Sequence, residues 1–286
     1  MNIIPTEPEL ENLLRTGQLP VAAIFYDLPA GYELIRARYH NSDFRPSRVA
    51  EIYYPPDPEK IHIGRANDWN QQVFYGMLPT GGRGPRLAAY QEIADDVNPI
   101  PTFTVSRWRL KKPLTGVLSL IMHEAQAGGN DFAQLTYQRN MAYIEDLPFL
   151  YRGQVKRTLD QIGQMFAKKV TDCDYRRTVE FANYYFNEGF NAIIYPSVSY
   201  DYKAVCIAMP KHVADEYLQA VRGGLIQIHL MDGGQDECCY QTFTVEGGTL
   251  KWTDYDDGQK RPPFTSSFIP QRDNPCRDLR DRLRGR

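Results

Sequence analysis

Residues 64–92 read GRANDWNQQVFYGMLPTGGRGPRLAAYQE, and the interpretation of the whole chain starts from this stretch. A turn-forming GRAN segment leads into the strand-like run VFYG, and a glycine-rich loop then leads into an expected helix that carries Glu92. The stretch supplies a cation at Arg65, an aromatic ring at Tyr75 and a carboxylate at Glu92. This combination predicts a site for a phosphate-bearing, ring-containing ligand whose reaction builds up positive charge.

Two other segments carry candidate site residues. Upstream, the apolar run LIRAR holds Arg36 and Arg38, which point to the same face if the run is a strand. Downstream, the run IIYPSVS holds Ser197 and Ser199, which share strand parity in the same way. The sequence alone therefore leaves open which arginine and which serine line the site.

Arginine, glutamate and serine in this order and in these settings resemble the RES-domain family, which is named for those three residues. The matching fragments are IRAR, YYPPDP, GRAN, VFYG, AAYQE, VSRWRL and FNAIIYPSV, and they span roughly residues 21–209. Members of that family are typically toxins that destroy NAD. Their fold is related to ADP-ribosyltransferase domains, and a cognate antitoxin blocks the site.

The resemblance implies a role for each candidate residue. Arginines clamp the pyrophosphate of NAD, Tyr75 positions the nicotinamide ribose, Glu92 stabilises a cation, and Ser197 orients the ribose or the acceptor. The expected catalytic residues are Glu92, Arg65, Tyr75 and Ser197. The residues expected to bind NAD are Arg36, Arg38, Gly64, Asn67 and Tyr90. Of the two upstream arginines, the resemblance favours Arg36.

The chemistry of NAD cleavage fits these residue types. Breaking the bond between nicotinamide and ribose passes through an oxocarbenium-like state, which a nearby carboxylate stabilises. One carboxylate suffices because the leaving group is a neutral pyridine that needs no proton. An arginine holds a pyrophosphate better than a lysine does, since its planar guanidinium donates two parallel hydrogen bonds. The acceptor stays open between water, inorganic phosphate and a macromolecule.

The expected function is that of an NAD-cleaving toxin, a glycohydrolase or phosphorylase that depletes cellular NAD. Transfer of ADP-ribose to a macromolecular target is an alternative with the same chemistry. A non-catalytic nucleotide-binding or interaction module is an alternative of another class. The expected partners are NAD+ as the substrate, a neutralising antitoxin or immunity protein, and a second copy of the chain in a homodimer.

Composition and charge narrow the class of protein. With 42% hydrophobic residues among 286, the chain can bury a sizeable core. A formal net charge of -2 argues against a general nucleic-acid binder. The five cysteines form no CxxC pair, so no metal is expected and a reduced cytoplasmic site of action is favoured, in the producing cell or in another cell that receives the toxin. The N-terminus does not read as a signal peptide, and no apolar run is long enough to span a membrane.

The expected fold is α/β in the α+β sense. Its core is a split, mixed β-sheet resembling that of ADP-ribosyltransferases, with a helical insertion at about residues 131–188 and a C-terminal β extension. The expected units are an N-terminal helix at 1–20, a RES-like NAD-binding catalytic domain at 21–222, a β-rich extension at 223–270 and a charged tail at 271–286.

Local patterns predict individual elements of this fold. Strands are expected at 21–27, 32–39, 191–196 and 203–209, and a helix at 85–97. The β-rich runs 102–110 and 114–121 are joined by a Lys-Lys-Pro turn and predict a hairpin. Pro210 is expected to open a helix that the glycines at 223–224 end, and the glycines after Glu246 predict another hairpin.

Overall fold

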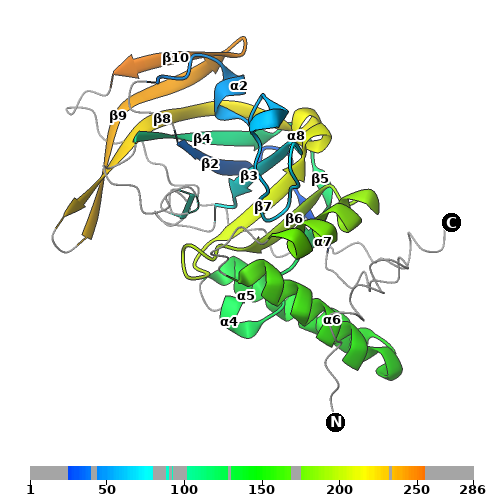
Figure 1. Ribbon diagram of the computed structural model, residues 1–286. Helices are drawn as coiled ribbons and strands as arrows, with labels where there is room; N and C mark the ends of the chain where they lie inside the picture. Colours follow the sequence, from blue (N-terminus) through cyan, green and yellow to red (C-terminus); the bar gives the residue numbers. More distant parts are fainter. Residues whose placement is uncertain are drawn as a thin grey trace.

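The computed structural model describes residues 25–39, 44–79, 88–89, 92, 102–127, 130–168, 175–231 and 234–254. Within them the chain forms a mixed α+β fold around one large β-sheet, with helices packed on both faces (Figure 1). The N-terminal helix expected at 1–20, Tyr90, most of the helix expected at 85–97, and everything from residue 255 onward lie outside the described residues.

The sheet has ten strands among the described residues, in the order β1-β5-β6-β7-β3-β2-β4-β8-β9-β10. Its neighbouring strands are antiparallel except β5 and β6, which run parallel. The strands are β1 (Phe25–Leu28), β2 (Glu33–Tyr39), β3 (Val73–Met77), β4 (Thr102–Leu110), β5 (Leu114–Ser119), β6 (Ala192–Pro196), β7 (Val205–Pro210), β8 (Leu218–Met231), β9 (Gly234–Glu246) and β10 (Thr249–Asp254). The helical segments are α2 (Val49–Ile52), the short 3-10 helix η1 (Pro58–Lys60), α4 (Glu124–Ala127), α5 (Asp131–Asp146), α6 (Phe149–Ala167), α7 (Arg176–Asn187) and α8 (Lys211–Tyr217).

Most of the predicted strands are confirmed. The strand expected at 32–39 is β2, and those expected at 191–196 and 203–209 are β6 and β7. For the strand expected at 21–27, the described part begins with β1. These runs are rich in β-branched and apolar residues, so their local signal and their final structure agree.

The predicted hairpin between 102–110 and 114–121 is wrong, because β4 and β5 do not pair. β4 pairs with β2 and β8, whereas β5 pairs with β1 and β6. The two strands lie five positions apart in the sheet, although only residues 111–113 separate them in the chain. In a flat sheet, steps of about 4.8 Å would place them about 24 Å apart, beyond the roughly 14 Å that this connection can reach. The sheet must therefore curl until its β4 and β5 regions meet.

The sheet curls where two paired segments of the chain bend together. Residues 25–39 run antiparallel to residues 102–119, through β1 and β5 at one end and through β2 and β4 at the other. Gly31 lies at the bend with a φ of 81°, and its N–H donates to the carbonyl of Leu110 at 2.8 Å. Glycine adopts this left-handed conformation readily. Both segments therefore turn together from one part of the sheet into the other.

Helices α5, α6 and α7 confirm the predicted helical block at 131–188. Phe166 of α6 and Tyr185 of α7 pack in one cluster with Ile193 and Tyr195 of β6. Phe132 and Ala133, at the start of α5, pack in a second cluster with Ile194 of β6, and Figure 1 shows α5 beside α6. The block is therefore part of the core and not an addition to a finished domain.

Two clusters of buried side chains lie on opposite faces of the sheet. We call the side that packs against Phe166 of α6 the α6 face, and the side that packs against Val213 and Ala214 of α8 the α8 face. Successive residues of a strand alternate between the two faces. In β3, Tyr75 packs on the α6 face and Phe74 on the α8 face.

The predicted helix after Pro210 is too long, because α8 ends at Tyr217 and strand β8 follows directly. A Cβ on Gly223 would lie 2.3 Å from the carbonyl oxygen of Val105 and 2.4 Å from the ring of Phe243. Glycine is therefore required at this position by close packing within the sheet, and it does not end a helix.

Strands β8, β9 and β10 continue the same sheet. β8 pairs with β4 along residues 102–110, so the β-rich part expected from residue 223 onward is joined to the core by a full strand pairing. The hairpin predicted after Glu246 is confirmed. Gly247 and Gly248, with φ of 57° and 80°, join β9 to β10.

Candidate functional site

The GRAN turn is fixed by the side chains of Asn67 and Tyr75. The Tyr75 hydroxyl donates to Asn67 Oδ1 at 2.7 Å and accepts from the N–H of Ala66 at 2.8 Å. Asn67 is buried, and its Nδ2 donates to the carbonyls of His62 and Asp68, both at 2.9 Å. These bonds hold the backbone on both sides of Arg65.

Gly64 closes the turn from the other end. Its N–H donates to the carbonyl of Asn67 at 3.0 Å, and a Cβ here would lie 2.5 Å from Asn67 Oδ1 and 3.0 Å from the Tyr75 hydroxyl. Burial raises the pKa of Tyr75, so its hydroxyl stays protonated as a donor. Both its donor and its acceptor capacity serve the turn. The hydroxyl that the resemblance implies contacts a ribose thus also holds the turn that carries Arg65.

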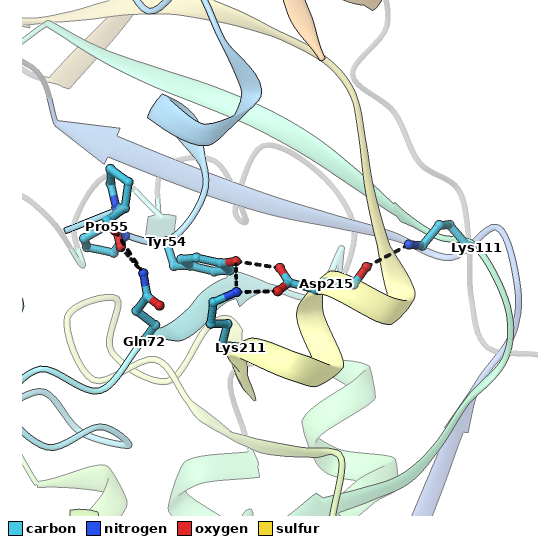
Figure 2. Close-up of polar contacts among 7 residues, drawn as sticks. Tyr54, Pro55, Gln72, Lys111, Lys211 and Asp215 are labelled. Carbon is cyan, nitrogen blue, oxygen red and sulfur yellow. Dashed lines mark hydrogen bonds and ion pairs between the residues drawn. The ribbon is translucent and has the colours of Figure 1, made fainter. Parts of the chain in front are cut away.

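A polar cluster anchors both ends of the loop that contains this turn. Figure 2 shows the Tyr54 hydroxyl donating to Asp215 Oδ1 at 2.6 Å, while Lys211 Nζ donates to the Tyr54 hydroxyl at 2.9 Å and to Asp215 Oδ2 at 2.6 Å. Gln72, just before β3, donates through Nε2 to the carbonyl of Pro55 at 2.8 Å. The two ends of the loop are thereby tied to each other and to α8.

Arg65 reaches from the turn to the C-terminal end of α6. Its Nη1 donates to the carbonyls of Phe166 and Lys168, at 2.7 and 3.1 Å. The guanidinium carbon also lies 5.4 and 5.9 Å from the ring centroids of Tyr175 and Tyr195. A helix C-terminus leaves carbonyls unpaired and carries partial negative charge, which favours a cation here. The position of Arg65 is thus set by the helical block.

The same helix end is held by the turn that follows β6. The Tyr202 hydroxyl donates to the carbonyl of Ala167 at 3.1 Å, between the two carbonyls that Arg65 binds. Asp201 and Tyr202 have φ of 47° and 61°. A backbone of this kind costs about 1–3 kcal/mol for a residue other than glycine. The bonds that Tyr202 makes to Ala167 and, through its N–H, to the carbonyl of Ser197 at 2.8 Å offset this cost.

Ser197 meets Glu92 at this point of the fold. Ser197 Oγ donates to Glu92 Oε1 at 2.6 Å, although the residues are 105 positions apart in the chain. Ser197 is fully buried and follows β6, with its N–H donating to the carbonyl of Ala204 at 2.9 Å. Glu92 is exposed, and its N–H donates to the carbonyl of Ala88 at 3.0 Å, as in a helix. A buried hydroxyl thus fixes one oxygen of a carboxylate that solvent reaches.

The two serines that the sequence left as alternatives differ in burial and in hydrogen bonding. Ser199 lies in the turn after β6 and is exposed. Ser197 lies at the strand end and bonds to Glu92. Ser197 and Ser199 do not point to the same face of one strand, because the strand ends at Pro196 and the chain turns before Ser199.

Arg65 and Glu92 act on the same two buried side chains. Burial raises the pKa of Tyr195 and of the Cys206 thiol well above their usual values, the charge of Glu92 adds to this, and the charge of Arg65 opposes it. Cys206 therefore stays a neutral thiol and is no candidate nucleophile. The cation and the carboxylate converge on the region where β6 and β7 pair.

The other two arginines lie on the opposite face of the sheet. Ile35 and Ala37 pack on the α6 face, so the alternation of β2 directs Arg36 and Arg38 to the α8 face. Arg36 donates to the backbone carbonyl of Tyr75 and lies 5.2 Å from the ring centroid of Phe74. The pyrophosphate clamp expected from Arg65 with Arg36 or Arg38 is thus not assembled, because Arg65 lies on the α6 face.

Burial lowers the pKa of both guanidinium groups of this pair. Arg36 is almost fully buried, and burial, followed by repulsion from Arg38, lowers its pKa to about 9. Arg38 donates to the carbonyl of Tyr53 at 2.8 Å, and burial lowers its pKa too. The sequence correctly indicated that the two share a face, but it held no signal for which face carries the site.

Two residues that contribute to the candidate site could not be singled out from the sequence. Tyr195 packs beside Arg65, and Tyr202 holds the end of α6. In a chain with 19 tyrosines neither stands out. The position of Tyr195 next to Pro196 and Ser197 was the one available signal. The role of Tyr202 depends on where α6 ends, which no local pattern encodes.

No group of three or more His, Cys, Asp or Glu side chains that could hold a metal ion occurs in the described part of the chain. Among the same residues, no helix is both long and apolar enough to cross a membrane. No protein-family model matches the chain, and no curated protein matches it.

Proposed function

We propose that the protein cleaves the bond between nicotinamide and ribose in NAD+. The observation that carries this proposal is the 2.6 Å hydrogen bond from Ser197 Oγ to Glu92 Oε1. Together with Arg65, these are three of the four residues that the resemblance to RES-domain proteins implies are catalytic, and Tyr75 is the fourth. A curled, mixed sheet with helices on both faces is also consistent with a core related to that of ADP-ribosyltransferases.

In the proposed reaction the bond between C1′ of the ribose and the nicotinamide nitrogen breaks, and its electrons leave with nicotinamide. The positive charge that develops on the ribose is stabilised by the Glu92 carboxylate. Water then adds to C1′ and releases a proton, which gives ADP-ribose and nicotinamide. With inorganic phosphate as the acceptor, the phosphate oxygen forms the new bond to C1′.

Ser197 acts in this proposal by holding the carboxylate in place. It binds Oε1 of Glu92, and within the described residues Oε2 has no hydrogen-bond partner. Oε2 can therefore face the ligand. A charge that is oriented before the substrate arrives needs no reorganisation during the reaction, which is the main source of electrostatic catalysis.

Arg65 is the proposed contact for the pyrophosphate. Its hydrogen bonds to described residues use Nη1 only, so Nε and Nη2 remain as donors to a phosphate. The end of α6 holds the guanidinium in place beforehand, which reduces the entropy lost on binding. Arg36 and Arg38 have no part in this clamp.

A protein with this activity would deplete the NAD of the cell in which it acts, and we propose that it is a toxin. Its neutralising protein would bring acidic or polar groups toward Arg65. Transfer of ADP-ribose to a macromolecule begins with the same bond cleavage and differs in the acceptor.

Incubation of the purified protein with NAD+ tests the proposal. Three parallel reactions contain buffer alone, inorganic phosphate or a cell lysate, and the products are separated by chromatography. Free ADP-ribose, a phosphorylated product or a modified protein identifies the acceptor. NAD+ that binds but stays intact would instead favour a nucleotide-binding module.

A further inference from the structure

The corner between α5 and α6 carries an exposed apolar patch that the proposed reaction does not use. Phe149, Leu150 and Tyr151, in the first turn of α6, are 83%, 86% and 59% exposed. Single exposed apolar side chains are common, but three in succession form a patch of the kind found at interfaces. Figure 1 shows α5 and α6 extending away from the sheet.

Charges of opposite sign border this patch on its two sides. Glu145 and Asp146 end α5 just before it, and Arg152 and Lys156 follow it on α6. All four are exposed. In the described part of the chain, Glu145, Asp146 and Lys156 form no ion pair, and Arg152 donates through Nε to the carbonyl of Leu147 at 2.6 Å. The patch is thus acidic at one end and basic at the other.

We propose that this patch, 149–151 with its charged borders, binds a second copy of the same chain about a two-fold axis. A two-fold axis brings the same surface of two copies together in opposite directions. The acidic end of one copy then faces the basic end of the other, on both sides of the axis. The patch is therefore complementary to itself. A surface that binds an acidic or a basic partner would instead carry charges of one sign.

An exposed glycine supports close contact at this surface. Gly153 lies one turn after Phe149 on the same side of α6. Among the described residues, a Cβ there would meet only Arg157 Nη1, at 3.3 Å, so nothing in that part of the chain requires glycine. Glycine inside a helix is destabilising relative to alanine. In the dimer, Gly153 leaves room for Phe149 of the second copy.

The size of the patch sets the strength of the dimer. Each aromatic side chain buries roughly 150–250 Å² when covered, so both copies together bury on the order of 1,000 Å². This is the lower end for a specific interface. The dimer should therefore be weak, dependent on protein concentration, and weakened by salt because of its charged borders.

The interface is separate from the proposed NAD site. Arg65 binds the C-terminal end of α6, and the patch lies at its N-terminal end. A helix of 19 residues places these ends roughly 25 Å apart. Variants in the patch should therefore leave NAD+ binding unchanged, and the failure of either proposal does not affect the other.

Sedimentation of the full chain over a range of concentrations tests the dimer. Leu150→Glu should raise the dimer dissociation constant at least about tenfold, since it puts a charge at the centre of the interface. Trp69→Glu is the matched control, because Trp69 is 57% exposed but lies outside the patch. Circular dichroism verifies that both variants fold.

A charge exchange separates a second copy from any other partner. Glu145→Lys and Lys156→Glu should each weaken the dimer by up to about fivefold, and the double variant should restore it, because its two copies regain opposite charges. A wild-type chain that stays monomeric at high concentration would overturn the proposal. So would a dimer that persists in Leu150→Glu, or a double variant no tighter than the single ones.

Discussion

Ser197 and Glu92 lie 105 positions apart in the chain and are joined by a hydrogen bond of 2.6 Å. Ser197 is buried directly after β6, whereas Glu92 belongs to a helical turn that solvent reaches. The pair therefore connects the rigid core of the α6 face to the surface. A dissolved ligand can meet there a carboxylate whose orientation the core determines.

Replacing Tyr75 by phenylalanine should destabilise the protein. The change removes the partner of the Ala66 N–H and of Asn67 Oδ1, and a buried polar group without a partner lowers the free energy of unfolding by about 1–3 kcal/mol. Tyr185→Phe is the matched control, because the buried Tyr185 hydroxyl has no hydrogen-bond partner among the described residues. It should be neutral or stabilising. Equal losses in urea unfolding would remove Tyr75 from its positioning role.

Lysine at position 65 should not restore the NAD+ affinity that arginine provides. Arg65→Ala should lower NAD+ affinity roughly tenfold to a hundredfold, the value of one or two hydrogen bonds to a charged group. Arg65→Lys should bind little better, since an ammonium group cannot hold the carbonyls of Phe166 and Lys168 and also present paired donors to a phosphate. Titration calorimetry measures the affinities. Substantial rescue by lysine would argue against the bidentate contact.

Arg36→Met should leave NAD+ affinity within about twofold of wild type, because Arg36 lies on the α8 face and its loss removes no direct donor to the ligand. The same calorimetric titration that is applied to Arg65 measures this. A loss of affinity as large as that of Arg65→Ala would mean that the ligand contacts the opposite face of the sheet.

The contribution of Arg36 to the free energy of unfolding should change with pH in the alkaline range. Burial lowers the pKa of Arg36 from its usual value to about 9 in the folded chain, so above about pH 9 the unfolded chain binds more protons. Stability rises with pH under that condition. The free energy of unfolding of wild type, relative to Arg36→Met, should be constant below about pH 9 and increase above it. A difference that stays flat from pH 7 to 10 would contradict the depressed pKa.

Expression in a bacterial host provides the cellular test of the toxin proposal. Induction of the wild-type chain should lower cellular NAD and slow growth, and Glu92→Gln should do neither. If both slow growth equally, toxicity does not arise at this site. If neither does and NAD is unchanged, a binding module becomes the better interpretation.

Elements with a strong local signal could be predicted from the sequence. The hairpin at Gly247 and Gly248 depends on two adjacent residues with positive φ, and glycine is the residue that adopts them readily. The GRAN turn was recognised for a similar reason, although the close approach of Asn67 to Gly64 was not foreseen. Such features depend on a few neighbouring residues.

Features that depend on distant packing could not be predicted. The prediction of a β4–β5 hairpin was wrong because each strand pairs with other strands of the curled sheet. The sequence around Gly223 is typical of a helix end, and the close approach of the Val105 carbonyl, which requires the glycine, leaves no local signal. In the site, residue types and order indicated Glu92 and Ser197. To predict which face of the sheet Arg36 occupies, one needs the strand pairing and the buried clusters on both faces.

Release of nicotinamide from NAD+ by the purified wild-type chain and by Glu92→Gln tests the central claim most directly. Glu59→Gln, which changes an exposed glutamate of η1, serves as the control. Cleavage should fall by roughly two to four orders of magnitude in Glu92→Gln while NAD+ still binds, because the lost charge acts mainly in the transition state. Glu59→Gln should match wild type. Turnover of Glu92→Gln near the wild-type rate, or no release by wild type, would contradict the proposed function of this site.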